Sequence, residues 1–378
     1  MKVVTIVGTR PEIIRLSRVI DRLDRTNEIE HVLVHTGQNY DYELNGIFFK
    51  DLGLRKPDYI LDVDTSSLGT VLGGILLKCE PVLRAENPDA VLVLGDTNSC
   101  ISAIIAKRMR IPVYHMEAGN RCFDENVPEE TNRRLVDHVA DFNLVYTEHA
   151  RRNLLAEGLH PRRILKTGSP IREVIDAYRG QIEASSIVSD LGLTDHQYLL
   201  VSAHREENVD SPARLTELLN SLIAVRSKFE LPVFVSTHPR TRARLNQLPG
   251  THLSTGITFN DPLGFHDYNK LQLSAACVLS DSGTIAEESS LLGFPAVTLR
   301  DSIERPEALD TGAIIMTGLN AEDIVAGVRA AMQARAKCND TDGMIPPDYL
   351  IDNCSQRTVH FILSTAHRHH QWEGIRRA

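Results

Sequence analysis

Short apolar runs rich in β-branched residues alternate with longer amphipathic stretches along the first half of the chain. This alternation predicts strands at residues 3–7, 31–35, 90–94, 112–115, 142–146 and 164–167. Helices are predicted between them, for example at 12–23, 99–108, 132–139 and 148–157. Because strands that alternate with helices form parallel sheets, the first half is predicted to be a doubly wound α/β domain.

The same pattern restarts after a polar, helical segment that runs from about Gly168-Ser169-Pro170 to Asp195. Strands are predicted at 198–202, 233–236, 276–280, 296–299 and 313–316, and helices at 215–228, 240–248, 268–273, 284–292 and 321–332. We therefore predict two Rossmann-like domains, residues 1–170 and 171–354, with a last helix at about 355–378 that completes the first. Ligands of such sheets lie beyond the carboxyl ends of the strands, so the active site is predicted in the cleft between the domains.

Composition and charge narrow the class of protein. The 378 residues carry a net charge of −9, which argues against nucleic acid as the main partner. No apolar run reaches the roughly 18 residues that span a bilayer, and the first residues enter a strand directly. The six cysteines lack zinc spacing and read as free thiols, and the segment His367-Arg368-His369-His370 reads as a solvated helix end. We expect a cytoplasmic protein without a metal.

Acidic residues follow the predicted strands of the first half. Asp96 comes after residues 90–94, Glu117 after 112–115, and Glu129 lies in a Pro-Glu-Glu turn soon afterwards. Carboxylates that share one site push their pKa values apart, so one can act as a base while another holds a proton. The alternative is that each carboxylate caps a helix or pairs with a nearby arginine, for which Arg121, Arg133 and Arg134 are available.

The turn after the first strand reads Gly8-Thr9-Arg10-Pro11-Glu12. Glycine permits a tight strand-to-helix turn, and proline suits a first helical position. Arg10 would then present its guanidinium at the sheet edge to a carboxylate or phosphate. The alternative is a helix cap with an exposed arginine. The turn is not a GxGxxG motif, so no dinucleotide fingerprint is present here.

Three segments of the second half carry candidate chemistry. Asp281-Ser282-Gly283-Thr284 joins a strand to a helix, an arrangement that binds phosphate, although the same residues are also a capping box. Glu288, one turn later, could accept from ribose hydroxyls. In the segment 204–208, Arg205 would pair with phosphate and His204 would donate to a leaving oxygen. His238 is a weaker candidate, because it follows a strand in what is often only a loop.

Taken together, these motifs resemble the non-hydrolysing UDP-N-acetylglucosamine 2-epimerases. The motifs stand in family order over almost the whole chain: Gly8–Glu12, Gly95-Asp96-Thr97, His115–Gly119, Pro128–Glu130 with Asn132-Arg133, His204–Glu206, Asp281–Gly283, Glu287-Glu288 and Glu304–Glu307. The resemblance implies the GT-B fold and a cofactor-free reaction. In that reaction C2 loses a proton, UDP leaves C1 to give a 2-acetamidoglycal, and UDP then adds back while C2 is protonated from the other face.

Residue by residue, the resemblance implies Asp96, Glu117, Glu129 and His204 as catalytic. The substrate-binding residues it leads us to expect are Arg10, Arg15, Arg133, Arg205, His238, Phe265, Ser282, Gly283, Thr284, Glu288 and Arg305. The partner expected is a UDP-sugar, with neither nucleic acid nor membrane, and the chain is expected to form a homodimer.

Several positions depart from the common family pattern. Residues 37–42 read Gly-Gln-Asn-Tyr-Asp-Tyr where a Gln-His pair is typical, Arg15 replaces a usual lysine, and Asn120 replaces a usual leucine. Five positions, Tyr40, Tyr42, Asn98, Asn120 and Phe123, are similar to the branch that converts UDP-2-acetamido-2,6-dideoxy-L-talose to UDP-N-acetyl-L-fucosamine for capsule or O-antigen synthesis. UDP-N-acetylglucosamine remains the alternative substrate. A GT-B glycosyltransferase is a second alternative, although three acidic residues stand where its acceptor groove would lie.

Overall fold

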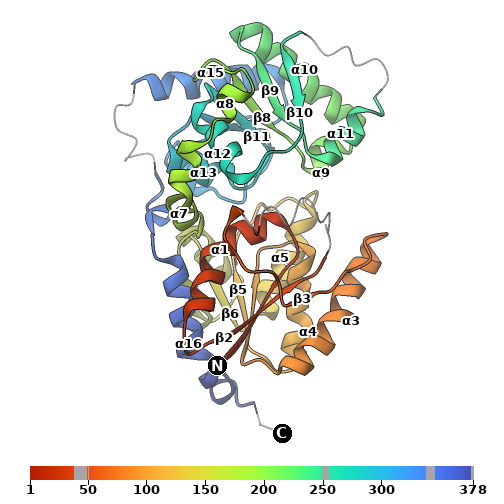
Figure 1. The fold of residues 1–378 in the computed structure, drawn as a ribbon, viewed down its shortest axis with the longest axis vertical. Helices are drawn as coiled ribbons and strands as arrows, with labels where there is room; N and C mark the ends of the chain where they lie inside the picture. Colours follow the sequence, from red (N-terminus) through yellow and green to blue (C-terminus); the bar gives the residue numbers. More distant parts are fainter. Residues whose placement is uncertain (38–48, 50, 249–254, 338–344, 376–378) are drawn as a thin grey trace. The chain divides into compact units, whose positions relative to one another are not determined.

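The computed structural model describes residues 1–37, 49, 51–248, 255–337 and 345–375 (Figure 1). The chain forms two compact units, Met1–Asp176 with Asp348–Ala378, and Ala177–Pro347. Tyr40 and Tyr42, which entered the prediction of the L-sugar branch, lie outside the described residues. Within the described ranges, no helix combines the length and the apolar character needed to cross a bilayer.

The first unit is built on a parallel sheet of seven strands in the order β3-β2-β1-β4-β5-β6-β7. Its strands are β1 (Lys2–Val7), β2 (Glu30–His35), β3 (Tyr59–Ile60), β4 (Ala90–Leu94), β5 (Val113–Met116), β6 (Phe142–Val145) and β7 (Ile164–Lys166). Its helices are α1 (Arg10–Arg25), α3 (Leu68–Glu86), α4 (Ser102–Arg108), α5 (Pro128–Val139), α6 (Glu148–Ala156) and α16 (Cys354–Trp372), with a 3₁₀ turn η1 (Asn98–Ile101) before α4.

The second unit repeats the design with six parallel strands in the order β10-β9-β8-β11-β12-β13. These strands are β8 (Leu199–Ser202), β9 (Val233–Ser236), β10 (Ile257–Asn260), β11 (Cys277–Ser280), β12 (Ala296–Thr298) and β13 (Ile315–Met316). Its helices are α8 (Ile187–Asp190), α9 (Glu206–Val209), α10 (Pro212–Phe229), α11 (Pro239–Leu245), α12 (Phe265–Ser274), α13 (Ile285–Leu292), α14 (Glu307–Asp310) and α15 (Ala321–Lys337), and α7 (Ile171–Ala184) enters it from the first unit.

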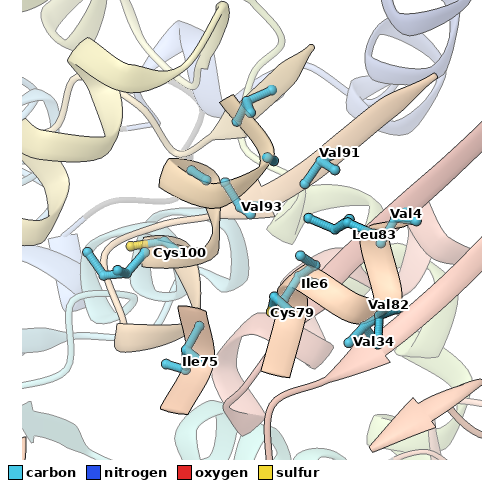
Figure 2. Packing of buried hydrophobic residues seen from close by; sticks show 14 of the residues in the cluster. Val4, Ile6, Val34, Ile75, Cys79, Val82, Leu83, Val91, Val93 and Cys100 are labelled. Atoms are coloured by element: carbon cyan, nitrogen blue, oxygen red, sulfur yellow. The ribbon is translucent and has the colours of Figure 1, made fainter. Parts of the chain in front are cut away.

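Central strands are buried on both faces, which is why they read as continuous apolar runs rather than as alternating ones. In the first unit, Val4 and Ile6 of β1 and Val91 and Val93 of β4 pack against α3 in one cluster (Figure 2). On the opposite face α16 packs against α1 (Figure 1). In the second unit Leu199 and Val201 of β8 pack with α10 and α15, and Leu200 packs with α12 and α13 in a separate cluster. Both sheets thus carry helices on both faces, and the predicted pair of doubly wound α/β units is confirmed.

Candidate active site

Two predicted carboxylates follow neighbouring strands at the same edge of the first sheet. Leu94, the last residue of β4, is in register with Met116, the last residue of β5, so Asp96 and Glu117 leave the sheet side by side. Glu117 has a φ of 62°, in the left-handed region that side chains other than glycine rarely adopt. A Cβ atom added to Gly95, the residue before Asp96, would stand 3.7 Å from Glu117 Oε2. The two segments are therefore in close proximity.

Each of these carboxylates has an arginine as its counterion. Arg15, on the second turn of α1, contacts Glu117, and Arg133, on the second turn of α5, contacts Asp96. Both arginines are predicted substrate-binding residues. The alternative interpretation from sequence, pairing with a nearby arginine, thus describes the geometry of Asp96. Pairing and chemistry are compatible, since the ion pair presents the carboxylate oxygens at a fixed place at the sheet edge.

The Pro-Glu-Glu turn forms the beginning of α5, and its two carboxylates differ in surroundings. Glu130 is buried, and its carboxylate accepts from Arg133 Nη1 at 2.6 Å and from Arg134 Nε at 3.1 Å. Glu129, the predicted catalytic residue, is half-buried in the first turn of α5. Glu130 therefore anchors the helix, and Glu129 is the more accessible carboxylate of the pair.

The turn after β1 contains both features that the sequence offered as alternatives. Thr9 and Glu12 form a capping box at the start of α1, with Glu12 Oε2 accepting from the amides of Gly8 at 3.0 Å and Thr9 at 2.7 Å. Arg10 stands half-buried at the first helical position. Burial raises the pKa of Glu12, whose other oxygen accepts from the Ser99 hydroxyl beside Asp96. Glu12 thus ties the Arg10 turn to the Asp96 turn.

In the second unit Asp281, directly after β11, organises the loop that begins with His204. Its buried carboxylate accepts from the amide of His204 at 3.0 Å, the amide of Arg205 at 3.0 Å, and Asn208 Nδ2 at 3.1 Å. The His204 Nδ1 atom lies 3.4 Å from Asp281 Oδ1. Burial lowers the pKa of His204, and Arg205 and Arg300 add to this effect while Asp281 opposes it. His204 is therefore neutral at pH 7 and has one ring N–H to donate.

The Ser282–Thr284 segment joins β11 to α13. The Ser282 and Thr284 hydroxyls lie 3.0 Å apart, and Thr284 makes no side-chain cap, so the capping box read from the sequence is not formed. Both hydroxyls are half-buried. Several amides of this segment donate to nearby groups: Ser282 to the Ser280 hydroxyl at 3.1 Å, Thr284 to the Ser282 hydroxyl at 3.4 Å and Ile285 to the Ser282 carbonyl at 3.3 Å.

Two further predicted residues have structural contacts around this segment. Arg305 is 3% exposed, donates from Nη1 to the Gly283 carbonyl at 2.7 Å, and lies with Nε 2.9 Å from Glu287. Arg305 therefore holds the Ser282–Thr284 segment in place. Glu288 Oε2 accepts from Gln272 Nε2 at 2.7 Å, so one of its two carboxylate oxygens is occupied.

The other predicted residues of this unit, His238, Arg205 and Phe265, differ in their surroundings. His238 precedes α11, accepts from the Arg240 amide at 3.2 Å, and its ring centre is 5.8 Å from that of His204. Arg205 is half-buried, 3.8 Å from Glu304. Phe265 is buried at the start of α12 against Tyr178, where it contributes to packing.

The sequence did not reveal the role of Asp137, a buried carboxylate near the edge of the first unit's sheet where Glu117 lies. Asp137 lies on α5 one turn beyond Arg133 and two turns beyond Glu130, so these three buried residues share one face of the helix. That spacing was visible in the sequence. The residues that Asp137 contacts were not, because they lie on β5 and on the loop after it.

Comparison with known proteins gives a consistent picture. The family model described as UDP-N-acetylglucosamine 2-epimerase matches residues 21–368. A UDP-N-acetylglucosamine 2-epimerase structure from Rickettsia bellii is 45% identical, with 98% of each chain covered and a TM-score of 0.90. The Methanocaldococcus jannaschii enzyme, solved with UDP-GlcNAc and UDP, is 34% identical, covering 96% of this chain and 100% of that one with a TM-score of 0.88.

A curated relative of different specificity is also similar. The UDP-2,3-diacetamido-2,3-dideoxy-D-glucuronate 2-epimerase of Pseudomonas aeruginosa is 35% identical over 336 residues, 88% of this chain and 92% of the relative. A glycosyltransferase of kitacinnamycin, 9% identical with a TM-score of 0.61, shares the fold alone, and with it the GT-B class predicted from sequence is confirmed. This chain belongs to the UDP-N-acetylglucosamine 2-epimerase family and is an isomerase.

Proposed function

We propose that this enzyme inverts C2 of a UDP-2-acetamido sugar without releasing free sugar. A carboxylate removes the C2 proton, the C1–O bond breaks with its electron pair on the UDP oxygen, and a C1–C2 double bond forms. The UDP oxygen then adds back to C1, and a proton reaches C2 from the opposite face. The observation that carries the proposal is the pair Asp96 and Glu117, side by side beyond β4 and β5, each in contact with a different arginine.

Two separate acidic groups suit this chemistry. Inversion needs one group to take a proton from one face of C2 and a second group to supply one to the other face. Asp96, Glu117 and the half-buried Glu129 are the candidates for these two roles. Arg10 at the start of α1 would approach the sugar or the diphosphate at the same edge.

The nucleotide half of the reaction is assigned to the second unit. The amides and hydroxyls of Ser282–Thr284, at the start of α13, would bind the diphosphate, with Arg205 as a further cation. His204 is neutral and can donate its ring N–H to the departing UDP oxygen, which stabilises the negative charge that develops there.

For the sugar we propose UDP-2-acetamido-2,6-dideoxy-L-talose, converted to UDP-N-acetyl-L-fucosamine. Asn120 is one of the positions that resemble the L-sugar branch; its side chain is buried three residues after Glu117, and its Nδ2 has no hydrogen-bond partner among the described residues. Such an amide is a natural contact for a substrate oxygen. Phe123, 73% exposed in the same loop, offers an apolar surface for a 6-methyl group. UDP-N-acetylglucosamine is the second candidate, favoured by the activity named for the Rickettsia and Methanocaldococcus relatives.

The test is incubation of the enzyme with each UDP-sugar separately in D₂O, followed by proton NMR. The proposed reaction exchanges the C2 hydrogen for deuterium and produces the 2-epimer of the UDP-sugar. Loss of UDP with free sugar as the final product would refute the non-hydrolysing reaction. Equilibration of UDP-N-acetylglucosamine with UDP-N-acetylmannosamine, faster than turnover of the L-sugar, would refute the choice of substrate alone.

Two expectations about the protein's setting also stand as proposals. The product would enter capsule or O-antigen synthesis in the cytoplasm. The chain would form a homodimer. Sedimentation velocity tests the dimer directly. One chain has a mass of 42.1 kDa, and the proposed dimer would have twice that mass.

A further inference from the structure

Asp137 is a fully buried carboxylate that the reaction proposed above does not use. It lies in the last turn of α5 and is 0% exposed. Three groups from other parts of the first unit contact it: the amide of Gly119 at 3.1 Å, Nη1 of Arg121 at 2.7 Å, and Nδ1 of His115 at 2.9 Å. A carboxylate with this many donors is fixed in position and orientation.

One of these contacts holds the backbone that follows Glu117. Gly119 is two residues later, and its amide donates to both oxygens of Asp137, at 3.2 and 3.1 Å. The carbonyl of Gly119 accepts from Asn153 Nδ2 at 2.9 Å. Both backbone groups of Gly119 are thus bound by side chains, and the exit of the chain from Glu117 is set by Asp137 on one side.

A second contact reaches the backbone that precedes Asp96. His115 is fully buried in β5, and its Nε2 lies 2.7 Å from the carbonyl oxygen of Gly95. The partners of the ring are the Asp137 carboxylate at Nδ1 and the Gly95 carbonyl at Nε2. Asp137 therefore orients the His115 ring, and the ring orients the peptide that leads into Asp96.

We propose that Asp137 is a positioning residue. It holds Asp96 and Glu117 in their catalytic positions by fixing the backbone next to each of them. Glu117 is left-handed at a φ of 62°, a conformation that persists only where its surroundings enforce it. Asp137 is the group that reaches both strand ends, by one direct and one relayed hydrogen bond. It stands on the same face of α5 as Arg133, which contacts Asp96 directly.

The two acceptor oxygens of Asp137 are essential to this role, because the Gly119 amide donates to both of them and Arg121 Nη1 donates to one. An asparagine of the same shape would keep one acceptor oxygen and turn an NH₂ group toward Arg121, His115 or Gly119. At least one donor would then face another donor in a buried site. Asp137→Asn therefore removes the positioning function with little change in volume.

Asp141 provides the matched control. It is a buried carboxylate of the same unit, 1% exposed, and it contacts Lys107, His369 Nε2 at 3.2 Å and the Val113 amide at 2.9 Å. Val113 is the first residue of β5, so Asp141 binds the opposite end of the strand from Glu117. Asp141→Asn disrupts a comparable buried network without touching either strand end that carries a candidate acid.

The kinetic part of the test rests on the proposed function and compares Asp137→Asn with Asp141→Asn, well below the unfolding temperature of both. We expect Asp137→Asn to lower kcat by at least about tenfold, because a misplacement of about 1 Å at a reacting group can cost about a hundredfold, with KM for the UDP-sugar changed by less than about threefold. Asp141→Asn should retain kcat within about threefold of wild type. Equal kcat values for the two variants would overturn the positioning role.

Hydrogen exchange measured by mass spectrometry provides a readout that does not depend on activity. Peptides covering residues 113–120 should exchange faster in Asp137→Asn than in wild type, and Asp141→Asn should leave the amides at 117–120 protected. Unchanged exchange there in Asp137→Asn would overturn the inference. A wild-type enzyme inactive on every UDP-sugar would refute the proposed function, and the exchange experiment would still decide the role of Asp137.

If Asp137→Asn does not fold, His115→Asn replaces it in both experiments. That variant keeps a donor toward Asp137 and loses the one toward the Gly95 carbonyl. Faster exchange before Asp96 and a lower kcat are expected, and wild-type values of both would overturn the relay through His115.

Discussion

Gly283 gives the sharpest prediction about the proposed diphosphate site. A Cβ atom added there would stand 2.9 Å from Arg305 Nη1 and 3.1 Å from Glu304 Oε2, closer than carbon normally approaches either atom. Arg305 cannot rotate away freely, because it is bound to the Gly283 carbonyl at 2.7 Å and lies 2.9 Å from Glu287. Gly283→Ala must therefore shift the loop, the arginine, or both.

The size of the effect follows from these contacts. Overpacking a well-filled site by one carbon costs about 1–3 kcal/mol. A loss of about 3–5 kcal/mol would follow only if the substitution also separated Arg305 from Glu287. We expect the free energy of unfolding to fall by roughly 1–3 kcal/mol. The dissociation constant for UDP should rise at least about tenfold, which is about 1.4 kcal/mol, because the amides at the start of α13 move with the loop.

Gly180→Ala in α7 is the control, since it adds the same methyl group in the same unit with no heavy atom within 4 Å. A helical glycine replaced by alanine should stabilise by about 0.5–1 kcal/mol and leave UDP binding unchanged. Denaturant unfolding followed by circular dichroism and calorimetric titration with UDP measure both quantities. If Gly283→Ala matched Gly180→Ala in stability and wild type in UDP affinity, the packing argument and the site assignment would both be refuted.

Three further outcomes are expected. Glu117→Gln and Asp96→Asn should each lower kcat by at least about a hundredfold, the contribution of general acid or base catalysis, and a variant within a few-fold of wild type would remove its residue from the site. Ser282→Glu should abolish the rise in melting temperature that UDP produces, because it sets negative charge against phosphate; undiminished protection would mean that UDP binds elsewhere. Because the pKa of His204 is lowered in the fold, the unfolded chain binds a proton that the native state does not. Wild type should therefore lose stability relative to His204→Asn as pH falls below about 6.5, and parallel stability curves from pH 8 to pH 5 would contradict this.

Much of the fold could be predicted because central parallel strands, which are buried on both faces, appear in the sequence as continuous apolar runs. The predicted strand at 90–94 coincides with β4, and 233–236 coincides with β9. The edge strands β3 and β10 were missed, since β3 has two residues and β10 is only partly buried and so lacks a continuous apolar signal. The long helix α3 was also missed, because glycines and Pro81 interrupt a sequence that is apolar on most of its circumference.

The candidate site was predictable in its parts and not in its pairings. Asp96 and Glu117 could be placed at the sheet edge because both directly follow strands. Their counterions could not all be assigned, since Arg15 is 102 residues from Glu117 in sequence and comes near it only through the β1–α1 turn. Nor does the Pro-Glu-Glu turn indicate which glutamate faces inward. That choice depends on the rotation of α5, which the buried Glu130 and Asp137 reveal only in three dimensions.

The position of α16 has a consequence for the order in which the units mature on the ribosome. The first unit is discontinuous, and α16 packs its Phe361 against Tyr114 and Phe142 of the sheet, while Ser355 accepts from Arg22 Nε of α1 at 2.9 Å. Residues 177–347 are synthesised as one stretch, so the second unit can fold as soon as it emerges. The first unit, although its sheet is made earlier, must keep an apolar face uncovered until α16 appears. Chaperones that bind exposed apolar surface should therefore bind the nascent chain at its N-terminal sheet.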